Sequence, residues 1–314
     1  MRDANSPLVI VAIAAFRRPR MLERLLRALE SIDTIANVCV LVADNDAQHR
    51  ESADLCGHMN QAGYRWPIEA LIVPERGIAQ ARNALFEQAM RRDFDFIAIL
   101  DDDEWPESNW LDALLATQRE TNADALHGGI VRVFDRKPGP WTAQCVHMAD
   151  IRHPTGPVDM IAGTGNTLIA RRCLESMPTP YFDPKFALTG GEDRDFFTRL
   201  KQLGFNFAWA DNAIVYEHMT AARTTFKWAL TRAYRIGNSD MRVFLKTQPD
   251  ISALLREYAK IAGVVVLMPV WFFLTVAMLP ERAANSLFKF CRAAGKTAAL
   301  FGRYHNEYAV VHGA

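Results

Sequence analysis

The chain has 314 residues, of which half are hydrophobic and 23% are charged. Global disorder is therefore excluded, and the length suffices for an α/β domain with an appendage. Lys plus Arg and Asp plus Glu both number 36, which gives a formal net charge of zero. Because proteins that bind nucleic acid through its phosphates usually carry a basic excess, we expect no nucleic acid partner.

The five cysteines are scattered along the chain, at positions 39, 56, 145, 173 and 291, and form no Cys-x-x-Cys pair. An odd, scattered set argues against a disulfide framework and against a structural zinc site. It favours a reducing compartment, so we expect the chain to lie in the cytosol.

The first apolar run, Leu8–Ala15, predicts a buried strand. A signal peptide is the alternative, because Arg2 precedes the run and Ala12–Ala14 resembles a cleavage site. However, Asp3 also precedes it, and the run is as short as a signal peptide allows. A helix follows directly, with Pro19 in its first turn and an apolar face formed by Leu22, Leu25, Leu26 and Leu29.

Strand and helix signals then alternate as far as Trp110. Strands are predicted at Val38–Ala43, Ile68–Val73 and Phe96–Leu100, and helices at His49–Gly63 and Gly77–Arg92. Short apolar strands separated by helices predict an α/β fold with a doubly wound, mostly parallel sheet. Because ligands of such sheets bind beyond the carboxyl ends of the strands, polar residues at those ends are candidates for a site.

Carboxylates follow two of these strands. Asp44 ends the second, and Asp101–Glu104, four acidic residues in a row, follows the fourth. In extended backbone Asp101 and Asp103 face the same way, and two hard oxygen ligands suit Mg²⁺ or Mn²⁺. The alternative is an acidic turn that caps the next helix, predicted from Trp110 to Thr121. We favour the metal site, because strand end, spacing and fold class agree.

Two further features at these strand ends have ordinary alternatives. Asp44 could accept hydrogen bonds from a nucleobase or ribose, although Asp-Asn is also a plain turn. Gly77–Asn83 opens a helix whose first N–H groups could bind an anion. Arg82, in the same segment, could contact a phosphate with two hydrogen bonds or lie on the surface.

After residue 121 the pattern changes to short strands joined by long polar loops. Strands with mixed pairing are predicted at His127–Phe134, Val158–Ile161, Thr167–Ala170 and Phe207–Ala210, and a helix at Gly191–Leu203. Before that helix lies a second acidic pair, Glu192 and Asp193, preceded by two glycines. Paired carboxylates at a helix start can supply a general base, and helix capping is the alternative.

Three later residues could bind a metal or a diphosphate. His218 follows the predicted strand Ile214–Tyr216 and could be a late metal ligand, although a lone histidine is usually structural. Arg232 and Arg235 lie about one turn apart on a helical segment. They could neutralise a diphosphate, or form a solvated basic face.

The tail contains nineteen residues without a charge, Ile261–Leu279, with Pro269 as an expected kink. The length permits a transmembrane helix, but a single crossing would place the more basic downstream flank outside the cytosol. An in-plane or re-entrant hairpin keeps both flanks on one side. A buried helix in a soluble tail is the remaining alternative.

The segment Ala283–Phe301 supports the hairpin. Basic residues lie opposite an expected apolar face, as in an interfacial helix beside anionic lipid. That face would consist of Leu287, Phe290, Ala294, Thr297, Ala298 and Phe301. We therefore expect the tail to associate with a membrane surface, in a peripheral or monotopic manner.

Taken in order, these motifs resemble those of inverting glycosyltransferases of family 2, which have the GT-A fold. The resemblance covers residues 8 to 237. Its carriers are Phe16-Arg17-Arg18-Pro19, Ala43-Asp44-Asn45-Asp46, Gly77-x-x-x-Ala81-Arg82-Asn83, Leu100-Asp101-Asp102-Asp103, Gly191-Glu192-Asp193 and Arg232-x-x-Arg235. The acidic run Asp101–Glu104, with Pro106 and Trp110-Leu111 after it, is similar to that of bacterial exopolysaccharide glucosyltransferases of the succinoglycan type.

The resemblance implies a role for each of these residues. Asp193 would be the general base. The donor would be bound by Arg17, Asp44, Arg82 and Asp101; the acceptor by Glu192 and Trp110; the diphosphate by Arg232 and Arg235; and a divalent metal, Mg²⁺ or Mn²⁺, by Asp103 and His218. Residues 1–125 would form the nucleotide-sugar-binding half of the GT-A domain, 126–248 its acceptor-binding half, and 249–314 a helical membrane-associated tail.

The resemblance implies transfer of glucose from a UDP-sugar. A membrane-associated tail suits a lipid-linked saccharide as the acceptor, so we expect the protein to act at the cytoplasmic face of the inner membrane. Processive members of the family carry a Gln-x-x-Arg-Trp segment. Here Arg232-x-x-Arg235-Ile236 lacks both the glutamine and the tryptophan, which favours addition of a single sugar.

Two other functions remain compatible with these residues. A nucleotidyltransferase would also use a doubly wound sheet with metal-binding carboxylates, although the first strand lacks a glycine-rich phosphate loop after it. A non-catalytic, membrane-bound binder of sugars or nucleotides would not need both a metal cluster and a separate acidic pair. Release of UDP or of pyrophosphate separates the two enzymes, and binding without turnover would indicate the binder.

Overall fold

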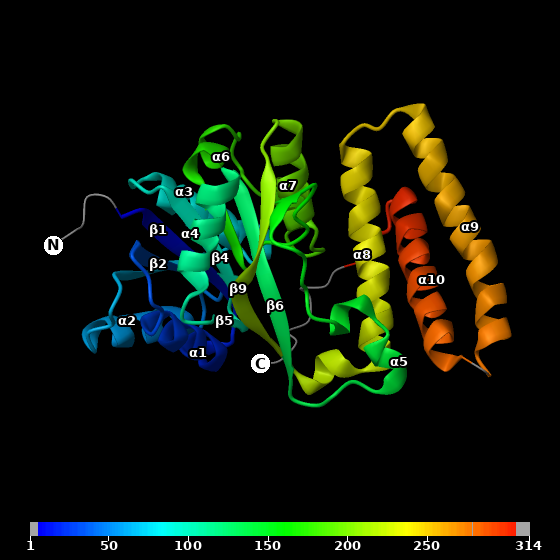
Figure 1. The fold of residues 1–314 in the computed structure, drawn as a ribbon, viewed down its shortest axis with the longest axis horizontal. Helices are drawn as coiled ribbons and strands as arrows, with labels where there is room; N and C mark the ends of the chain where they lie inside the picture. The colour runs from blue at the N-terminus through cyan, green and yellow to red at the C-terminus, as the bar shows by residue number, and fades with distance from the viewer. Residues whose placement is uncertain (1–5, 278, 306–314) are drawn as a thin grey trace.

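The computed structural model describes residues 6–277 and 279–305. Met278, within the predicted apolar segment, and residues 306–314 of the predicted tail lie outside this range. The described chain forms an α/β part, with a layer of three long helices, α8, α10 and α9, beside it (Figure 1).

The α/β part is built around one sheet, whose described strands follow the order β3-β2-β1-β4-β8-β6-β9-β5, with β7 paired to β9. The strands are β1 (Leu8–Ala15), β2 (Asn37–Asp44), β3 (Ile68–Ile72), β4 (Phe96–Asp101), β5 (Glu104–Pro106), β6 (Ala125–Phe134), β7 (Gly156–Val158), β8 (Thr167–Ala170) and β9 (Phe207–Met219). The first four pair in parallel, and β8, β7 and β5 pair antiparallel. The parallel arrangement thus belongs to the N-terminal half, and the second half is mixed, as predicted.

Helices cover both faces of the sheet, which confirms the doubly wound arrangement. Alternate residues of β1 face opposite cores: Val9 and Val11 pack with α1 (Pro19–Glu30), α2 (Glu51–Gln61) and α4 (Trp110–Thr121). On the other side, Ile10 and Ala12 pack with α3 (Ile78–Met90), α6 (Arg171–Glu175) and α7 (Glu192–Gln202). A strand buried on both faces explains why Leu8–Ala15 is apolar throughout.

Two strand predictions need correction. The segments Phe207–Ala210 and Ile214–Tyr216 belong to one long strand, β9, whose pairing with β6 shifts register between Gly128 and Ile130. This irregularity hides the continuity from the sequence pattern. The strand predicted at Val158–Ile161 occurs earlier, at Gly156–Val158.

The remaining helices include short ones within the α/β part and the three long helices beside it. They are α5 (Pro140–Ala143), α8 (Phe226–Lys246), α9 (Ile251–Thr275), α10 (Pro280–Leu300) and the short 3₁₀ turns η1 (Val146–Met148), η2 (Pro184–Phe186) and η3 (Ala221–Thr224). Helices α8 and α10 approach very closely. A Cβ atom on Gly237 would lie 1.9 Å from the carbonyl oxygen of Arg292, and one on Gly295 would lie 1.9 Å from that of Tyr234. Only glycine therefore fits at either position without displacing backbone.

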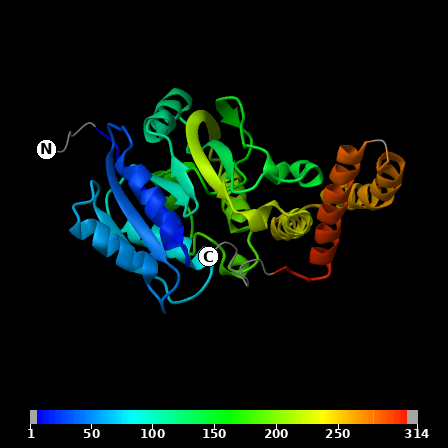
Figure 2. The same ribbon diagram turned by 90° about the horizontal axis from the view of Figure 1, so that it is seen from below.

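Helix α9 is the outer helix of the tail (Figures 1 and 2). Among the described residues it is the one helix long and apolar enough to cross a membrane, and only 6% of its most apolar stretch is buried. Exposed apolar side chains occur along it, including Val266, Val270, Phe273 and Leu274. It begins ten residues before the predicted segment and contains Pro269 in its interior.

The prediction of an interfacial apolar face on α10 is wrong. The fully buried side chains of α10 include Ala284, Phe288 and Ala293, and they pack within the helical layer. Leu287 and Phe290, on the predicted face, are only half-buried. Because α10 lies between α8 and α9, the outer apolar surface of the tail belongs to α9 (Figure 1).

Candidate active site

The carboxyl ends of β1 and β4 open into a cavity of about 220 Å³. Residues from the β1–α1 turn, the start of α3, the turn after β4, strands β6 and β9 and helix α8 line it. Four carboxylates and seven arginines face it; the arginines are Arg18, Arg76, Arg82, Arg132, Arg223, Arg232 and Arg235. This excess of cations suits an anionic ligand.

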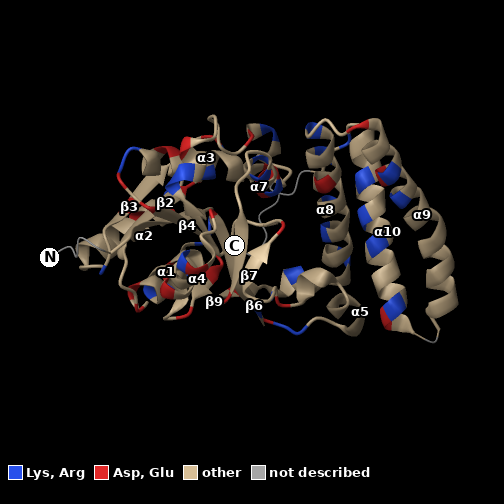
Figure 3. Ribbon diagram, turned by 45° about the horizontal axis from the view of Figure 1, so that its top comes forward, with Lys and Arg blue, Asp and Glu red and all other residues tan. Residues whose placement is uncertain are grey.

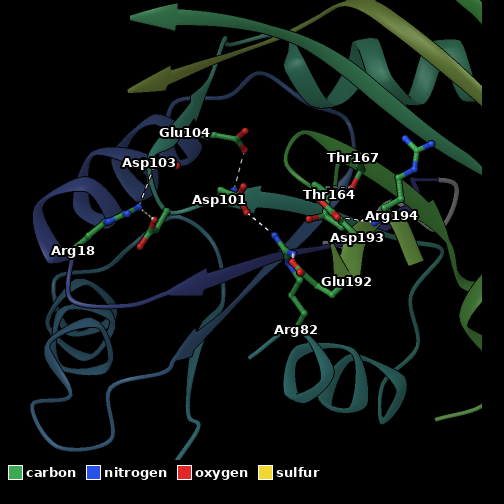
Figure 4. A network of polar contacts seen from close by, with 11 residues as sticks. Arg18, Arg82, Asp101, Asp103, Glu104, Thr164, Thr167, Glu192, Asp193 and Arg194 are labelled. Carbon is green, nitrogen blue, oxygen red and sulfur yellow. Dashed lines mark hydrogen bonds and ion pairs between the residues drawn. The ribbon is translucent and has the colours of Figure 1, made fainter. Parts of the chain in front are cut away.

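The backbone turns directly after Asp101, the last residue of β4, and β5 begins at Glu104. The alternation expected of extended chain therefore fails here, and Asp102, not Asp101, becomes the partner of Asp103. Arg18 Nη1 lies 3.0 Å from Asp102 Oδ1 and 3.1 Å from Asp103 Oδ2 (Figure 4). Arg223 Nη1 lies 2.7 Å from the same Oδ2. Two carboxylates thus converge on one cationic nitrogen.

These two carboxyl groups titrate differently. Burial raises the pKa of Asp102 to about 7, the charge of Asp103 acts in the same direction, and Arg18 opposes them. Burial acts in the same direction on Asp103, but Arg223 and Arg18 together hold its pKa below the usual value. Asp103 is consequently ionised at neutral pH, as a carboxylate that binds a cation must be.

A buried arginine connects this turn to the second acidic pair. Arg82, at the start of α3, donates to Asp101 Oδ1 at 3.0 Å and also to Glu192 Oε1 (Figure 4). The side chains of Arg82 and Glu192 are 5% and 3% exposed. A single guanidinium therefore links the end of β4 to the start of α7, although the two segments are far apart in the sequence.

The acidic pair lies at the N-terminus of α7, where Gly191 adopts a left-handed φ of 98°. Ser239 of α8 stabilises the turn at Gly190 and Gly191, because its Oγ donates to the Gly190 carbonyl at 3.2 Å. Burial raises the pKa of Glu192 to about 7, and it also raises that of Asp193. A carboxylate that is costly to keep charged accepts a proton more readily, which suits a general base.

Helix α8 supplies another wall of the cavity, with Trp228, Arg232 and Arg235. The positive charge of Arg235 lowers the pKa values of Glu192 and Asp193, against the effect of burial. Arg232 packs over Trp228, with its guanidinium carbon 5.8 Å from the ring centre. The predicted pair of arginines therefore faces the cavity from one helix.

Two predicted donor residues lie outside the set that lines the cavity. The Asp44 carboxylate accepts from the backbone N–H groups of Asp46, at 3.0 Å, and Ala53, at 2.9 Å, so it orders the turn and the start of α2. Arg17 is turned to Asp46, at 2.6 Å. Their neighbours Asn45 and Arg18 line the cavity instead.

Two other assignments are corrected by the structure. Trp110 is fully buried, and its Nε1 donates to Asn166 Oδ1 at 2.7 Å, so it belongs to the core and does not offer an acceptor surface. The His218 ring bonds Asp135 Oδ1 at 2.7 Å. Because side chains alternate along β9, the adjacent Glu217 lines the cavity in its place.

Sequence reasoning missed several charged residues of the cavity. Arg18 adjoins Arg17 in one motif, and the sequence does not show which of the two faces the site. Glu217 adjoins His218, and histidine is the more familiar metal ligand. Arg223 lies in the turn η3, where no periodicity or spacing distinguishes it. These residues meet only through the folding of β9 alongside β5 and β6.

The residues present fit a divalent cation in part. The oxygens of Asp102 and Asp103 already surround a cationic nitrogen, and carboxylate oxygens are ligands that Mg²⁺ and Mn²⁺ prefer. Within residues 6–277 and 279–305, no three His, Cys, Asp or Glu side chains form a complete metal site. Water and phosphate oxygens would have to supply the remaining ligands, as is usual for Mg²⁺.

Comparison with known proteins identifies the family. The pattern of "Glycosyl transferase family 2" matches residues 10–177, more than half of the chain, from within β1 to just after α6. This chain belongs to glycosyl transferase family 2. It is accordingly a glycosyltransferase, and the residue roles within its cavity can be considered in those terms.

Relatives of this family-2 chain are found both by sequence and by structure. It is 31% identical over 241 residues to the succinoglycan biosynthesis protein ExoM of Rhizobium meliloti, with 74% of each chain covered. The mannosyltransferase PcManGT of Pyrobaculum calidifontis, solved with GDP-Man and Mn²⁺, superimposes with a TM-score of 0.65 at 14% identity, over 96% of this chain and 89% of that one. TarS of S. aureus, residues 1–349 with UDP-GlcNAc, gives 0.51 at 13% identity, over 95% and 93%. The structural likeness establishes the GT-A fold.

Proposed function

We propose that the protein transfers one sugar, with glucose expected, from a UDP-sugar to a lipid-linked saccharide during bacterial exopolysaccharide or cell-surface glycan synthesis. The relative ExoM, named for succinoglycan biosynthesis, supports the process. The observation that carries the chemistry is the connection of two acidic centres through one buried arginine. Arg82 lines the cavity beside Asp101–Asp103 and bonds both Asp101 and Glu192, the neighbour of Asp193.

The donor would occupy the end of the cavity nearest β1 and β4. Asp103, with Asp102 beside it, would hold Mg²⁺ or Mn²⁺ there, and such a cation stabilises negative charge on a leaving diphosphate. PcManGT was solved with Mn²⁺, and so was GalNAc-T7. The donors named for the structural relatives include both GDP-mannose and UDP-GlcNAc, so UDP here rests on the family resemblance and on TarS.

The transfer step assigns a separate task to the second acidic centre. Asp193 takes the proton from an acceptor hydroxyl, whose oxygen forms a bond to the anomeric carbon of the sugar. On the opposite face of that carbon, the bond to the diphosphate oxygen breaks, which inverts the configuration. The electron pair leaves with the diphosphate, where Arg232 and Arg235 counter the new charge. Glu192 lies beside the base, held by Arg82.

The exposed apolar surface of α9 supports a lipid-linked acceptor. A helix this apolar and this little buried is stabilised when it rests in the interfacial region of a bilayer. The C-terminal half of α9 carries no charged residues, whereas basic residues occur along α10 (Figure 3). We propose that the protein lies at the cytoplasmic face of the inner membrane, which holds the cavity close to acceptors carried on lipid.

An in-plane position fits the tail better than a crossing. Helix α10 runs antiparallel beside α9, and Lys296 near its end pairs with Glu257 near the start of α9. Helix α10 is in turn held against α8 through Gly237 and Gly295. If α9 crossed the bilayer, it would draw Arg292, Lys296 and the catalytic wall α8 into the hydrocarbon, which is costly.

The test is product formation with a panel of donors. Purified protein is incubated with UDP-glucose, UDP-GlcNAc or GDP-mannose and a lipid extract of the producing bacterium, and both the released nucleotide and the lipid-linked saccharide are measured. We expect UDP release coupled to sugar transfer into the lipid fraction. Release of pyrophosphate, or binding of donor without transfer at any acceptor, would contradict the proposal.

A further inference from the structure

The carboxylates of the proposed cation site already have cationic partners. Asp103 Oδ2 accepts from Arg18 Nη1 at 3.1 Å and from Arg223 Nη1 at 2.7 Å. A carboxylate oxygen has about two lone-pair sites, so this oxygen is fully used. The side chains of Arg18 and Arg223 are 16% and 18% exposed and that of Asp103 is 9% exposed. The attraction within such partly buried pairs is screened less by salt than that of pairs on a surface.

The same two arginines also face the space that the donor would fill. Arg18 precedes the first turn of α1, and Arg223 lies in η3, between β9 and α8. Both line the cavity, from separate elements, together with Asp102 and Asp103. A divalent cation at Asp103 would repel their guanidinium groups and compete for the same oxygen. A diphosphate would attract them.

We propose that Arg18 and Arg223 act as counter-ions of Asp102 and Asp103 in the resting site, and that the divalent cation releases them to bind the donor diphosphate. The inference rests on the donor site of the proposed function. It makes the cation and the diphosphate bind cooperatively, because each guanidinium exchanges a carboxylate for phosphate oxygens only when both ligands arrive. Such coupling is reciprocal: each ligand raises the affinity of the other by the same factor.

Arg232 offers a matched control. It lines the same cavity, but its Nε makes no hydrogen bond to any residue that the structure describes, and it packs over Trp228. A diphosphate would gain from either arginine, whereas only Arg223 competes with a cation for Asp103. Substitution of the two arginines should therefore change cation binding differently.

The experiment measures Mn²⁺ binding alone by electron paramagnetic resonance, and UDP binding by calorimetry with and without Mn²⁺. For Arg223→Gln we expect Mn²⁺ alone to bind about fivefold or more tightly, and UDP with Mn²⁺ to bind at least about fivefold more weakly, the scale of typical coupling. For Arg232→Gln we expect weaker UDP binding with Mn²⁺ affinity unchanged. Arg18→Gln should shift both affinities in the same directions as Arg223→Gln.

Unchanged or weaker Mn²⁺ binding in Arg223→Gln and Arg18→Gln would overturn the inference, since the arginines would then support the carboxylates and not compete for them. Circular dichroism and thermal melting establish that each variant is folded, and Arg18→Gln decides the matter if Arg223→Gln is not. Wild-type protein that binds neither Mn²⁺ nor UDP would contradict the proposed donor site itself. Wild-type binding without the Mn²⁺ gain in the variants would contradict the inference alone.

Discussion

Glu192 and Asp193 are adjacent carboxyl groups in a poorly solvated place, and their protonation sets the pH range of the proposed reaction. Burial raises both pKa values, that of Glu192 to about 7. A general base must be ionised, so activity is lost as pH falls through its raised pKa. Folding responds in the opposite sense: a raised carboxyl pKa favours the folded state at low pH, and this contribution disappears as pH rises through it.

We therefore expect log kcat/KM to rise with pH, with an acid limb at higher pH than the ordinary pKa of an aspartate would give. In Asp101→Asn the acid limb should move to lower pH, because the negative charge of Asp101 helps to raise the pKa of Asp193. Initial rates from pH 5 to 9 check this, with circular dichroism to confirm folding. An acid limb that stays in place in the variant would contradict the coupling.

Asp193→Asn tests the base directly. A positioned base contributes roughly 10²–10⁴-fold to the rate, so turnover should fall by that factor while donor binding persists. The half-exposed pair of Arg92 with Glu69 of β3 lies outside the residues that line the cavity, and Arg92→Gln should leave the rate unchanged. Normal turnover in Asp193→Asn would remove Asp193 from the mechanism.

Arg82 matters as the link between the two acidic centres. Substitution of one partner of a buried ion pair leaves the other charge uncompensated, so Arg82→Gln at pH 8 should lower the free energy of unfolding by about 3–5 kcal/mol. The half-exposed pair Arg92–Glu69 is the control, for which about 0–1 kcal/mol is expected. Urea denaturation of both variants measures the difference, and equal losses would contradict the account.

At the level of helices and strands, the sequence predicts correctly those elements whose ends depend only on nearby residues. The helix at Trp110–Thr121 and the strand at Thr167–Ala170 occur with the predicted ends. The face of α10 was mispredicted because its neighbours α8 and α9 cover both sides, and small residues such as Ala284 form the contact. The prediction that Asp101 and Asp103 face the same way is wrong for another reason: the chain bends after Asp101, and side-chain alternation ends with the strand.

Replacement of glycine by alanine should have opposite effects on the free energy of unfolding at two positions, Gly295 in the contact between α8 and α10 and Gly263 in α9. Gly295→Ala should lower the free energy of unfolding by roughly 1–3 kcal/mol or more, because its Cβ would meet the Tyr234 backbone. Gly263→Ala, in α9 with no atom within 4 Å of a new Cβ, should raise it by about 0.5–1 kcal/mol. Chemical denaturation in the same detergent compares them. A stabilising Gly295→Ala would refute the close contact.

On the scale of the whole molecule, one helix joins the proposed chemistry to the proposed membrane surface. Helix α8 lines the cavity through Arg235, holds the acidic turn through Ser239 and contacts α10 through Gly237. The sequence predicts each of these segments. It does not predict that α8 contacts the cavity, the acidic turn and α10 together, because such contacts depend on packing between distant parts of the chain. The division at residues 125 and 248 remains a prediction, and one sheet runs through both halves.

Membrane association should depend on the outer face of α9. Val266, Phe273 and Leu274 are 65%, 75% and 67% exposed, and their joint replacement by serine should reduce sedimentation with anionic vesicles. Donor binding should not change. Leu203→Ser, at a similarly exposed leucine on the far side of α7, is the control. Undiminished vesicle binding by the triple variant would exclude α9 as the docking surface.

The most direct test of the central claim, a metal-bound donor site in the cavity and a separate base connected to it through Arg82, is calorimetric titration with UDP. It compares wild type, Asp103→Ala and Asp193→Asn in Mn²⁺ and then in EDTA. We predict that wild type and Asp193→Asn bind UDP only with the metal, and that Asp103→Ala loses this binding. Equal metal-dependent binding by Asp103→Ala and wild type, or no UDP binding by the folded wild type, would contradict the claim.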